Sequence, residues 1–565
     1  MGNNVDDWRK YPRFRSISVT FSSPRPWAVV SVLLAAVLGF QAGLSQNWWK
    51  LFSDGTSNKN TNLTSGLHAH LSICPIPIAH YEGCEDHNHV RPVACFPRDP
   101  PPPAKPCSQC SRHVHLAPGY DSSLSITVSY TIDYSCGKHV DTYVMVGEDP
   151  ASLDLKFMAN HESSSAQIRQ YTSTACMAED PTKCHRKGIH WCHTEHFGTY
   201  QSDWYFHVPL TGLRPQTTYY YMIYPPPCQQ HDVFTFRFKT APVKGEGYGL
   251  TLAVLADAGL SDDTTSTLHH ISSDLNIHGM IIAGDIGYPE RNHRVWDEWF
   301  HEYEFALSRI PTFTSPGNHD MDTDCCDWTT FKAYEHRFYM PQVQPAVMTP
   351  ACHEREAGPN YNVGSYDYGN AFYSAVMGPV HIIVLNTYTH SKTNSKQYQW
   401  LVQELQSVDR ILTPWLFVVA HANIYETFKR HLDEYPQRTM KNAMESLFNM
   451  YGVNIFFSGH DHAYARSHPT AYGKVHKTAP IYITIGNAGR DLQQDGLVHD
   501  EEWLASWNFS TFGYGTITVL NETHALWQTR FHNPSSYDIV SDTDAVYIEN
   551  FAYRYFSTKR FKSES

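Results

Sequence analysis

The stretch GYGLTLAVLADAG, residues 247–259, marks the point where the pattern of the chain changes, because a short apolar run ends there in a carboxylate. Five further apolar runs follow: MIIAG at 280–284, HIIVLN at 381–386, WLFVVAH at 415–421, NIFFSG at 454–459 and PIYITIG at 480–486. Stretches of helical pattern, such as residues 395–408, lie between them. Buried strands that alternate with helices are typical of an α/β layered domain, which we expect over residues 244–535.

Polar side chains follow these runs at the points where the strands should end. They are Asp257, Asp285, Tyr288, Asn318, His319, His421, His460 and His462. Taken singly, each fits a turn or a helix cap. Together they lie where α/β sheets bind ligands, beyond the carboxyl ends of the strands. Their number and type match a site in which one carboxylate bridges two metal ions.

Residues 111–243 have a different pattern, which predicts an antiparallel β-sandwich. SLSITVSYTID at 123–133 alternates polar and apolar residues, and 217–224 and 233–240 are further β-rich runs. Before them, residues 50–110 form a segment rich in cysteine and proline that contains four consecutive prolines. Such a proline run forms a stiff spacer, so we place a domain boundary there.

The amino terminus carries a candidate membrane segment. Residues 27–44, WAVVSVLLAAVLGFQAGL, contain no charge and would span about 27 Å as a helix, close to the thickness of a bilayer core. Basic residues precede them, which places residues 1–26 in the cytosol. Residues 27–49 are therefore a signal anchor, the alternative that we favour, or a cleaved signal peptide.

Charge and cysteine content restrict the partners and the compartment. The 43 lysines and arginines against 56 acidic residues give a net charge of -13, with no basic block that would bind nucleic acid. Ten of the thirteen cysteines precede residue 229, and only Cys107 and Cys110 have metal-knuckle spacing, so we expect disulfides and an oxidising compartment. We also expect a disulfide from Cys352 to Cys325 or Cys326, which would staple the loop after residue 320.

Two further features fit the secretory pathway. Asn62, Asn508 and Asn521 begin glycosylation sequons, as in a glycoprotein. The 34 histidines favour an acidic working environment, because their protonation would change the net charge strongly.

Five sequence blocks identify a family. They are DAG at 257–259, GDIGY at 284–288, GNHD at 317–320, VVAH at 418–421 and GHDH at 459–462. On these residues the chain resembles the purple acid phosphatases, a binuclear branch of the calcineurin-like metallophosphoesterases. Gly259 and Tyr288 favour that branch, because the wider superfamily has D-x-H in the first block and no tyrosine in the second. Residues 210–221 and 234–242 resemble the family's fibronectin-like amino-terminal domain, so the resemblance covers about residues 111–535.

The resemblance implies a complete set of metal ligands. Fe(III) would be bound by Asp257, Tyr288, His462 and the bridging Asp285. A divalent ion, Zn, Mn or Fe(II), would be bound by Asp285, Asn318, His421 and His460. A phenolate oxygen suits a trivalent ion, while an amide and two imidazoles suit a divalent one.

The implied activity is that of an acid phosphatase, which hydrolyses phosphoric monoesters by attack of a metal-bound hydroxide. His319 corresponds to a family histidine that contacts the substrate and transfers a proton, and His431 lies about where the family has another. Asp320 would either orient His319 or cap a helix. The stretch HANIYETFKRH, residues 421–431, departs from the family's H-x-P-W-Y. The resemblance therefore does not specify the shape of the leaving-group pocket or the substrate preference. We expect Asp461 to be a solvated loop residue.

Two alternative functions remain at this point. One is a phosphodiesterase or nucleotide pyrophosphatase that uses the same metal centre. The other is a membrane-anchored binding protein with a structural metal site. In the leading interpretation the partner is a small phosphate ester, and the membrane is contacted only through an uncleaved anchor. The location would be the cell exterior, the cell surface or a vacuolar or lysosome-like lumen. Residues 536–565 would be a tail, and a homodimer is left open.

Overall fold

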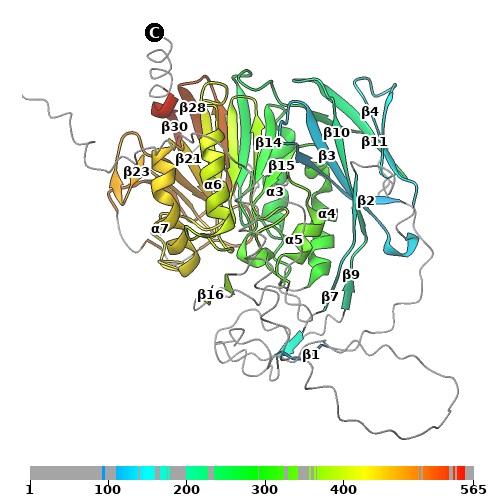
Figure 1. The fold of residues 1–565 in the computed structure, drawn as a ribbon, viewed down its shortest axis with the longest axis horizontal. Coiled ribbons are helices and arrows are strands. Elements are labelled where there is room, and N and C mark those ends of the chain that lie inside the picture. Colours follow the sequence, from blue (N-terminus) through cyan, green and yellow to red (C-terminus); the bar gives the residue numbers. More distant parts are fainter. Residues whose placement is uncertain are drawn as a thin grey trace, which may run out of the picture. The chain divides into compact units, whose positions relative to one another are not determined.

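Figure 1 shows the computed structural model of the protein. It describes Pro92–Cys95 and residues 110–553, except for 138–139, 160–165, 175, 179–198, 227–234, 291, 323–328, 342–355, 358–361, 364–365, 494–495, 498–500, 533–538 and 541–543. The chain divides into Met1–His70 and Leu71–Ser565, and every described residue belongs to the second unit. Among the described residues, no helix has the length and apolar character needed to cross a membrane. The candidate segment 27–44 and Cys325, Cys326 and Cys352 lie outside them.

Two antiparallel sheets form the predicted β-sandwich. One has the order β2 (Ser111–Pro118), β3 (Ser125–Ile132), β10 (Trp204–Thr211) and β6 (Gln167–Arg169). The other has the order β12 (Phe236–Lys239), β11 (Thr218–Tyr224), β4 (Tyr143–Gly147) and β5 (Leu155–Met158). Val128 and Phe206 of the first sheet and Val144 and Tyr221 of the second belong to one buried core. Alternating side chains of both sheets thus fill the sandwich, as the period-two pattern predicts.

The first sheet of the α/β domain is mixed. Its order is β15 (Thr312–Thr314), β14 (Ile277–Ile282), β13 (Leu250–Leu255), β27 (Phe512–Val519), β28 (His524–His532) and β29 (Ile539–Val540), with β30 (Ala545–Glu549) also paired to β28. Strands β13, β14 and β15 pair in parallel, and the other described neighbours in this sheet pair antiparallel. Strand β30 carries the sheet past residue 535, where we expected the tail to begin, and its Ile548 is buried in the core.

The second sheet packs against the first. Its order is β18 (Tyr373–Met377), β19 (Val380–Val384), β20 (Trp415–Val419), β21 (Ile455–Ser458), β25 (Ile481–Ile485), β22 (Tyr464–Ser467) and β26 (Leu504–Asn508), and β19, β20, β21 and β25 are parallel. Phe417 and Phe457 share a core with Leu252 and Ile281 of the first sheet. The two sheets therefore form the inner layers of an α/β sandwich, which confirms the predicted fold class.

Helices cover both sheets (Figure 1). On the second sheet, α6 (Lys396–Ser407) and α7 (Tyr435–Met450) bury Leu401 and Met444 against Leu416 and Phe456. On the first sheet lie α3 (Asp262–Ser273) and α4 (His293–Leu307), whose Leu268, Trp299 and Phe300 join its core. A short helix, α5 (Lys332–Arg337), follows the GNHD block. The remaining short strand pairs are β1 with β8 (Cys176–Ala178), β7 (Thr172–Thr174) with β9 (Thr199–Gln201), β16 (Glu356–Ala357) with β17 (Asn362–Val363) and β23 (Thr470–Ala471) with β24 (Lys474–Val475).

Helices α4 and α5 also contact the β-sandwich through a group of buried histidines. We call this group, His113, His115, His207, His293 and His336, the interdomain histidine cluster. Nε2 of His115 lies 3.0 Å from the carbonyl oxygen of Arg337, and Nε2 of His207 lies 3.1 Å from that of His336. Glu304 of α4 accepts a hydrogen bond of 3.0 Å from the backbone amide of Val114 in β2. These contacts join the two domains through neutral polar groups.

Burial keeps this cluster uncharged. It lowers the pKa of His115 to about 4 and that of His293 to about 3. The same loss of solvation raises the pKa of Glu304 to about 7. Arg337 places a fixed charge beside the cluster; it is fully buried, pairs with Asp297 at 2.9 Å and lies 5.3 Å from the ring centroid of Tyr205.

Candidate metal centre

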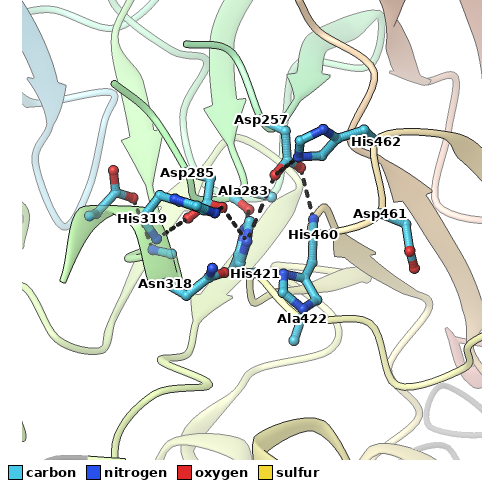
Figure 2. Close-up of polar contacts among 12 residues, drawn as sticks. Asp257, Ala283, Asp285, Asn318, His319, His421, Ala422, His460, Asp461 and His462 are labelled. Carbon is cyan, nitrogen blue, oxygen red and sulfur yellow. Dashed lines mark hydrogen bonds and ion pairs between the residues drawn. The ribbon is translucent and has the colours of Figure 1, made fainter. Parts of the chain in front are cut away.

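The predicted site residues come from the ends of five parallel strands. Strands β13, β14 and β15 of the first sheet lead to Asp257, Asp285, Tyr288 and Asn318. Strands β20 and β21 of the second sheet lead to His421, His460 and His462. Figure 2 shows that Asp257, Asp285, His421, His460 and His462 converge on one place between the two sheets. The structure therefore brings the seven predicted ligand residues together.

The backbone turns sharply where the ligand side chains leave the strands. Asp257, Asp285, Tyr288 and His460 have φ angles of 57°, 51°, 51° and 73°, in the left-handed region that side chains with a Cβ seldom adopt. Such strain persists where the surrounding structure holds it, and it gathers at functional sites. The turn at His460 explains how two histidines that are two positions apart in one loop, His460 and His462, can both face the centre.

Two glycines of the sequence blocks make room for carboxylates. A Cβ on Gly317 would lie 2.1 Å from Oδ1 of Asp285, and a Cβ on Gly459 would lie 2.4 Å from Oδ2 of Asp257. In the space that Gly317 leaves, Oδ1 of Asp285 accepts a hydrogen bond of 2.8 Å from the backbone amide of His319. The glycines of GNHD and GHDH are thus required by the close approach of the backbone to the acidic side chains.

Asp257, Tyr288 and His462 form one half of the centre. The hydroxyl oxygen of Tyr288 lies 2.9 Å from Oδ1 of Asp257 and 2.8 Å from Nε2 of His462. Nδ1 of His462 lies 2.6 Å from Oδ1 of Asp491, a carboxylate that the sequence analysis missed. Asp491 therefore orients the imidazole so that Nε2 faces Tyr288 and Asp257.

Asp285, His421 and His460 form the other half. Their donor atoms all lie within 4.8 Å of one another, and all three side chains are buried. Nδ1 of His421 is 2.8 Å from the carbonyl oxygen of Ala283, so Nε2 is directed at Oδ2 of Asp285, 3.2 Å away. Asn318 lies beside this half and accepts a hydrogen bond of 2.9 Å from the hydroxyl of Tyr388.

The donor set fits two cations. Nε2 of His421 is buried without a hydrogen bond of good geometry, although two carboxylates lie 3.2 and 3.8 Å from it. A backbone carbonyl fixes its other nitrogen, which is the usual arrangement of a metal-binding histidine. Two carboxylates, a phenol, an amide and three imidazoles supply the hard and intermediate donors that Fe(III) and a divalent ion prefer. The site thus has the composition of a binuclear centre.

The acids and imidazoles of the site shift one another's pKa values, which supports the interpretation as a metal centre. Burial alone would lower the pKa of His421, but the carboxylates of Asp285 and Asp257 raise it to about 10. Burial opposes the ionisation of Asp285, yet the imidazoles of His421 and His319 hold its pKa well below its usual range. Burial and the charge of Asp257 raise the pKa of the Tyr288 hydroxyl, so a phenolate at this position requires a cation.

His319 lies at the edge of the centre and is half-buried. Its ring centroid is 4.5 Å from that of Tyr288, and its Nε2 is 4.0 Å from Oδ2 of Asp285. Nδ1 of His319 is hydrogen-bonded to Glu290, so the residue that orients His319 is Glu290. Asp320 instead accepts hydrogen bonds from the backbone amides of Gly317, at 2.9 Å, and Ile286, at 3.0 Å. Of the two alternatives for Asp320, these contacts favour the cap-like one, because the amides satisfy both of its oxygens.

His431 lies beside the divalent half. Its ring centroid is 3.9 Å from that of His460. Both imidazoles contact one carboxylate, because Glu434 lies 2.9 Å from Nδ1 of His431 through Oε1 and 2.9 Å from Nε2 of His460 through Oε2. Glu434 thus holds the imidazole of His460 through Nε2, a role that the sequence analysis missed. No periodic signal marks Glu434 or Glu290, since both lie in loops.

Asp461 is not solvated, which corrects our expectation. Its side chain is fully buried and lies apart from the converging ligands in Figure 2. The amide of Asn423 donates hydrogen bonds to Oδ2 of Asp461, at 2.7 Å, and to Oε2 of Glu426, at 2.5 Å. Burial and the charge of Asp461 raise the pKa of Glu426, so a proton satisfies this acid pair. Asn423 stands at the third position of the departing HANIYETFKRH stretch, and its bond to Asp461 ties that stretch to the GHDH loop.

Two family models match the domain that carries these residues. The calcineurin-like phosphoesterase model matches residues 250–464. The model for the carboxyl-terminal part of iron/zinc purple acid phosphatase-like proteins matches residues 479–538. Together they include every strand end that contributes to the centre.

Individual relatives match most of their own length. The chain is 31% identical over 364 residues to purple acid phosphatase 22 of Arabidopsis thaliana, covering 63% of this chain and 76% of the relative. It is 28% identical to Fe(3+)-Zn(2+) purple acid phosphatase 12 of the same plant, covering 65% and 78%. It is 27% identical to phosphoenolpyruvate phosphatase of Allium cepa, covering 77% and 82%. The fold is also similar to that of a purple acid phosphatase from yellow lupin seeds, with a TM-score of 0.57 and 18% sequence identity. The match covers 78% of this chain and 74% of the lupin chain, which indicates a shared fold.

Proposed function

The chain belongs to the purple acid phosphatase family, and we propose that it hydrolyses phosphoric monoesters in acidic surroundings at a centre of two metal ions. The observation that carries this proposal is the convergence of Asp257, Asp285, His421, His460 and His462 from four strand ends. Relatives that are named as phosphatases support the reaction type.

The cofactors would be Fe(III) and a divalent ion, as the name of one relative and the donor set both support. Asp257, Tyr288, His462 and Asp285 would hold the iron, and Asp285, Asn318, His421 and His460 the second ion. When bound, such ions activate water at low pH and neutralise the charge of the phosphoryl oxygens.

Two histidines would act on the substrate. Since Glu290 contacts Nδ1 of His319, its Nε2 is free to face the centre and to donate a hydrogen bond to a phosphoryl oxygen. The hydrogen bond between Nδ1 of His431 and the carboxylate of Glu434 leaves Nε2 of that imidazole to donate a hydrogen bond to the leaving group. Both histidines would thus stabilise charge that develops on oxygen in the transition state and pass on a proton.

The protein would work outside the cytosol. Cys110 and Cys136 are disulfide-bonded, which favours an oxidising compartment. Asn508 ends strand β26 and Asn521 lies in a bend after β27, and both residues are partly exposed, as glycosylated asparagines require. We retain the segment 27–49 as an anchor or signal peptide. A protease-protection assay on microsomes, combined with glycosidase treatment, would test this location.

The activity test compares three substrates. Protein loaded with Fe(III) and Zn(II) is assayed between pH 4 and 8 with para-nitrophenyl phosphate, bis-para-nitrophenyl phosphate and ATP. The proposal predicts the highest kcat/KM for a monoester and an optimum below pH 7. A preference for the diester would instead indicate a phosphodiesterase. Metal binding without any turnover would favour the binding-protein alternative.

A further inference from the structure

Two loops at the rim of the metal centre each carry an exposed arginine. Arg430 belongs to the loop that follows β20, and Arg490 to the loop that follows β25. A backbone bridge between Phe428 and Leu497 joins the loops. Asp491 lies between the two arginines, with its Oδ2 3.7 Å from Nη1 of Arg430. The rim thus places two permanent positive charges near one opening.

Arg490 is held against the half of the centre that contains Tyr288. Its backbone amide donates a hydrogen bond of 3.1 Å to the carbonyl oxygen of Asp257, and its guanidinium carbon lies 4.9 Å from the ring centroid of Tyr288. Its Cδ fills the space over Gly259, where a Cβ would lie 2.9 Å from it. The glycine of the DAG block therefore makes room for this arginine.

Arg430 lies beside the other half of the centre. It directly precedes His431, whose ring packs 3.9 Å from that of His460. The backbone of Arg430 therefore follows the divalent half, while its guanidinium reaches Asp491, the partner of His462.

The acids near the two guanidinium groups are shared with imidazoles, Asp491 with His462 and Glu290 with His319. The carboxylate of Asp491 is occupied mainly by His462, at 2.6 Å, and lies farther from Arg430. Within the described part of the chain, Arg490 has no carboxylate within ion-pair distance, although the charge of Glu290 is near enough to interact with it. Both fork-shaped donor groups are thus available to an anion.

We propose that Arg430 and Arg490 bind a second anionic group of the substrate. The favoured substrates would be phosphate esters that carry another phosphoryl group or a carboxylate near the scissile phosphate. The metal ions and His319 would bind the phosphoryl group that is transferred to water, and the arginines would bind the additional anion. This inference rests on the proposed function, which it refines by naming the substrate class.

The kinetic test measures kcat/KM for para-nitrophenyl phosphate, ADP and phosphoenolpyruvate. Arg430→Gln, Arg490→Gln and the double variant are compared with Arg237→Gln, a control at an exposed position of β12 in the sandwich. In the double variant, kcat/KM for ADP relative to para-nitrophenyl phosphate should fall about 10- to 100-fold, because charge-assisted hydrogen bonds are lost. An equal fall for phosphoenolpyruvate would mean that the rim accepts either anion, and a fall for ADP alone would mean that it requires a phosphoryl group. Both results support the proposal.

A binding test separates affinity from turnover. Methylenediphosphonate, which resists hydrolysis, should bind the double variant about 10-fold or more weakly than wild type relative to orthophosphate. Arg490→Lys keeps the methylene groups over Gly259, so it distinguishes lost recognition from a disturbed loop and should recover part of the ratio. Unchanged ratios in both tests would overturn the inference while leaving the phosphatase intact. Absence of monoester hydrolysis by the loaded wild-type protein would instead overturn the proposed function.

Discussion

The metal centre and the interdomain histidine cluster are both buried groups of imidazoles and acids, yet they hold opposite charge states. In the metal centre, two carboxylates raise the pKa of His421 to about 10. In the interdomain cluster, burial lowers the pKa of His293 to about 3 and that of His336 to about 4, and Arg337 adds a positive charge. Glu304 is held largely protonated there, with a pKa of about 7.

The difference shows that buried histidines do not by themselves mark a metal site. In the metal centre the carboxylates of Asp257 and Asp285 converge with the imidazole of His421, so a cation can replace the proton that they hold there. In the interdomain cluster, histidines bind backbone carbonyls and contribute packing. Those histidines stay neutral in weak acid, so the histidine count overstates the charge that the protein gains as the pH falls.

The largest difference in kcat should appear when one acid is neutralised in the metal centre and one in the interdomain histidine cluster. Asp285→Asn keeps the side-chain shape but removes the bridging charge, so kcat for para-nitrophenyl phosphate should fall at least about 1,000-fold. Glu304→Gln is the matched control, because it makes the same isosteric change at a buried acid of the interdomain cluster and should leave kcat within about twofold. Turnover by Asp285→Asn within tenfold of wild type would contradict the two-metal site.

Removal of metal should destabilise only the metal centre. Ligands that bind the native state alone contribute about 4 kcal/mol at a thousandfold excess over Kd, so chelation should lower the melting temperature of wild type and of Glu304→Gln by the same several degrees. The apo and metal-treated forms of an Asp257→Asn, Asp285→Asn double variant should melt together. Equal shifts in all three proteins would place the stabilising metal elsewhere.

The interdomain cluster should be recognised by its dependence on pH. Because burial raises the pKa of Glu304 from 4.5 to about 7, the folded state binds more protons than the unfolded state between these values. The contribution of the protonated acid is full below pH 4.5 and is lost as the pH rises through 7, by at most about 3 kcal/mol. Urea unfolding at pH 4.5 and pH 8 should therefore show Glu304→Gln gaining stability over wild type only at pH 8. A difference that is the same at both pH values would refute the buried, protonated state.

The smallest change in stability should come from the buried acid pair Asp461 and Glu426, which Asn423 bridges. Asn423→Ala removes the hydrogen bonds to Asp461 and Glu426 and should cost about 1 to 2 kcal/mol of unfolding free energy. Asn449→Ala is a control on α7, where the lost bond is a single one of 2.9 Å to the carbonyl oxygen of Glu445. If the two variants are equally stable, Asn423 does not tie the loops together.

Sequence patterns predicted the convergence of the candidate ligand residues, because side chains at the ends of parallel strands have little positional freedom. Asp257, Asp285, His421 and His460 each follow an apolar run, and the parallel pairing within each sheet and the packing of the two sheets bring those ends together. The left-handed turns that aim the side chains were not predictable, since φ at an aspartate or histidine leaves no mark in the sequence.

Residues that act through loops escaped prediction. Glu434 reaches His460 across 26 positions, and Glu290 reaches His319 across 29. Asp461 resembled a solvated loop residue because its partner, Asn423, lies 38 positions away in another block. Such pairings depend on how two loops approach each other, which composition and spacing do not specify. The β-sandwich was easier to predict from the sequence, because polar and apolar residues alternate along its strands with a fixed period of two.

A visible absorption spectrum, combined with metal analysis, shows directly whether Tyr288 binds Fe(III) in a two-metal centre. Purified wild type should contain iron and a divalent metal and show a broad charge-transfer band. Tyr288→Phe should lose that band while Tyr388→Phe, a control at the hydroxyl that contacts Asn318, keeps it. Absence of the band from a fully metallated, active wild type, or its persistence in Tyr288→Phe, would contradict the phenolate-iron centre.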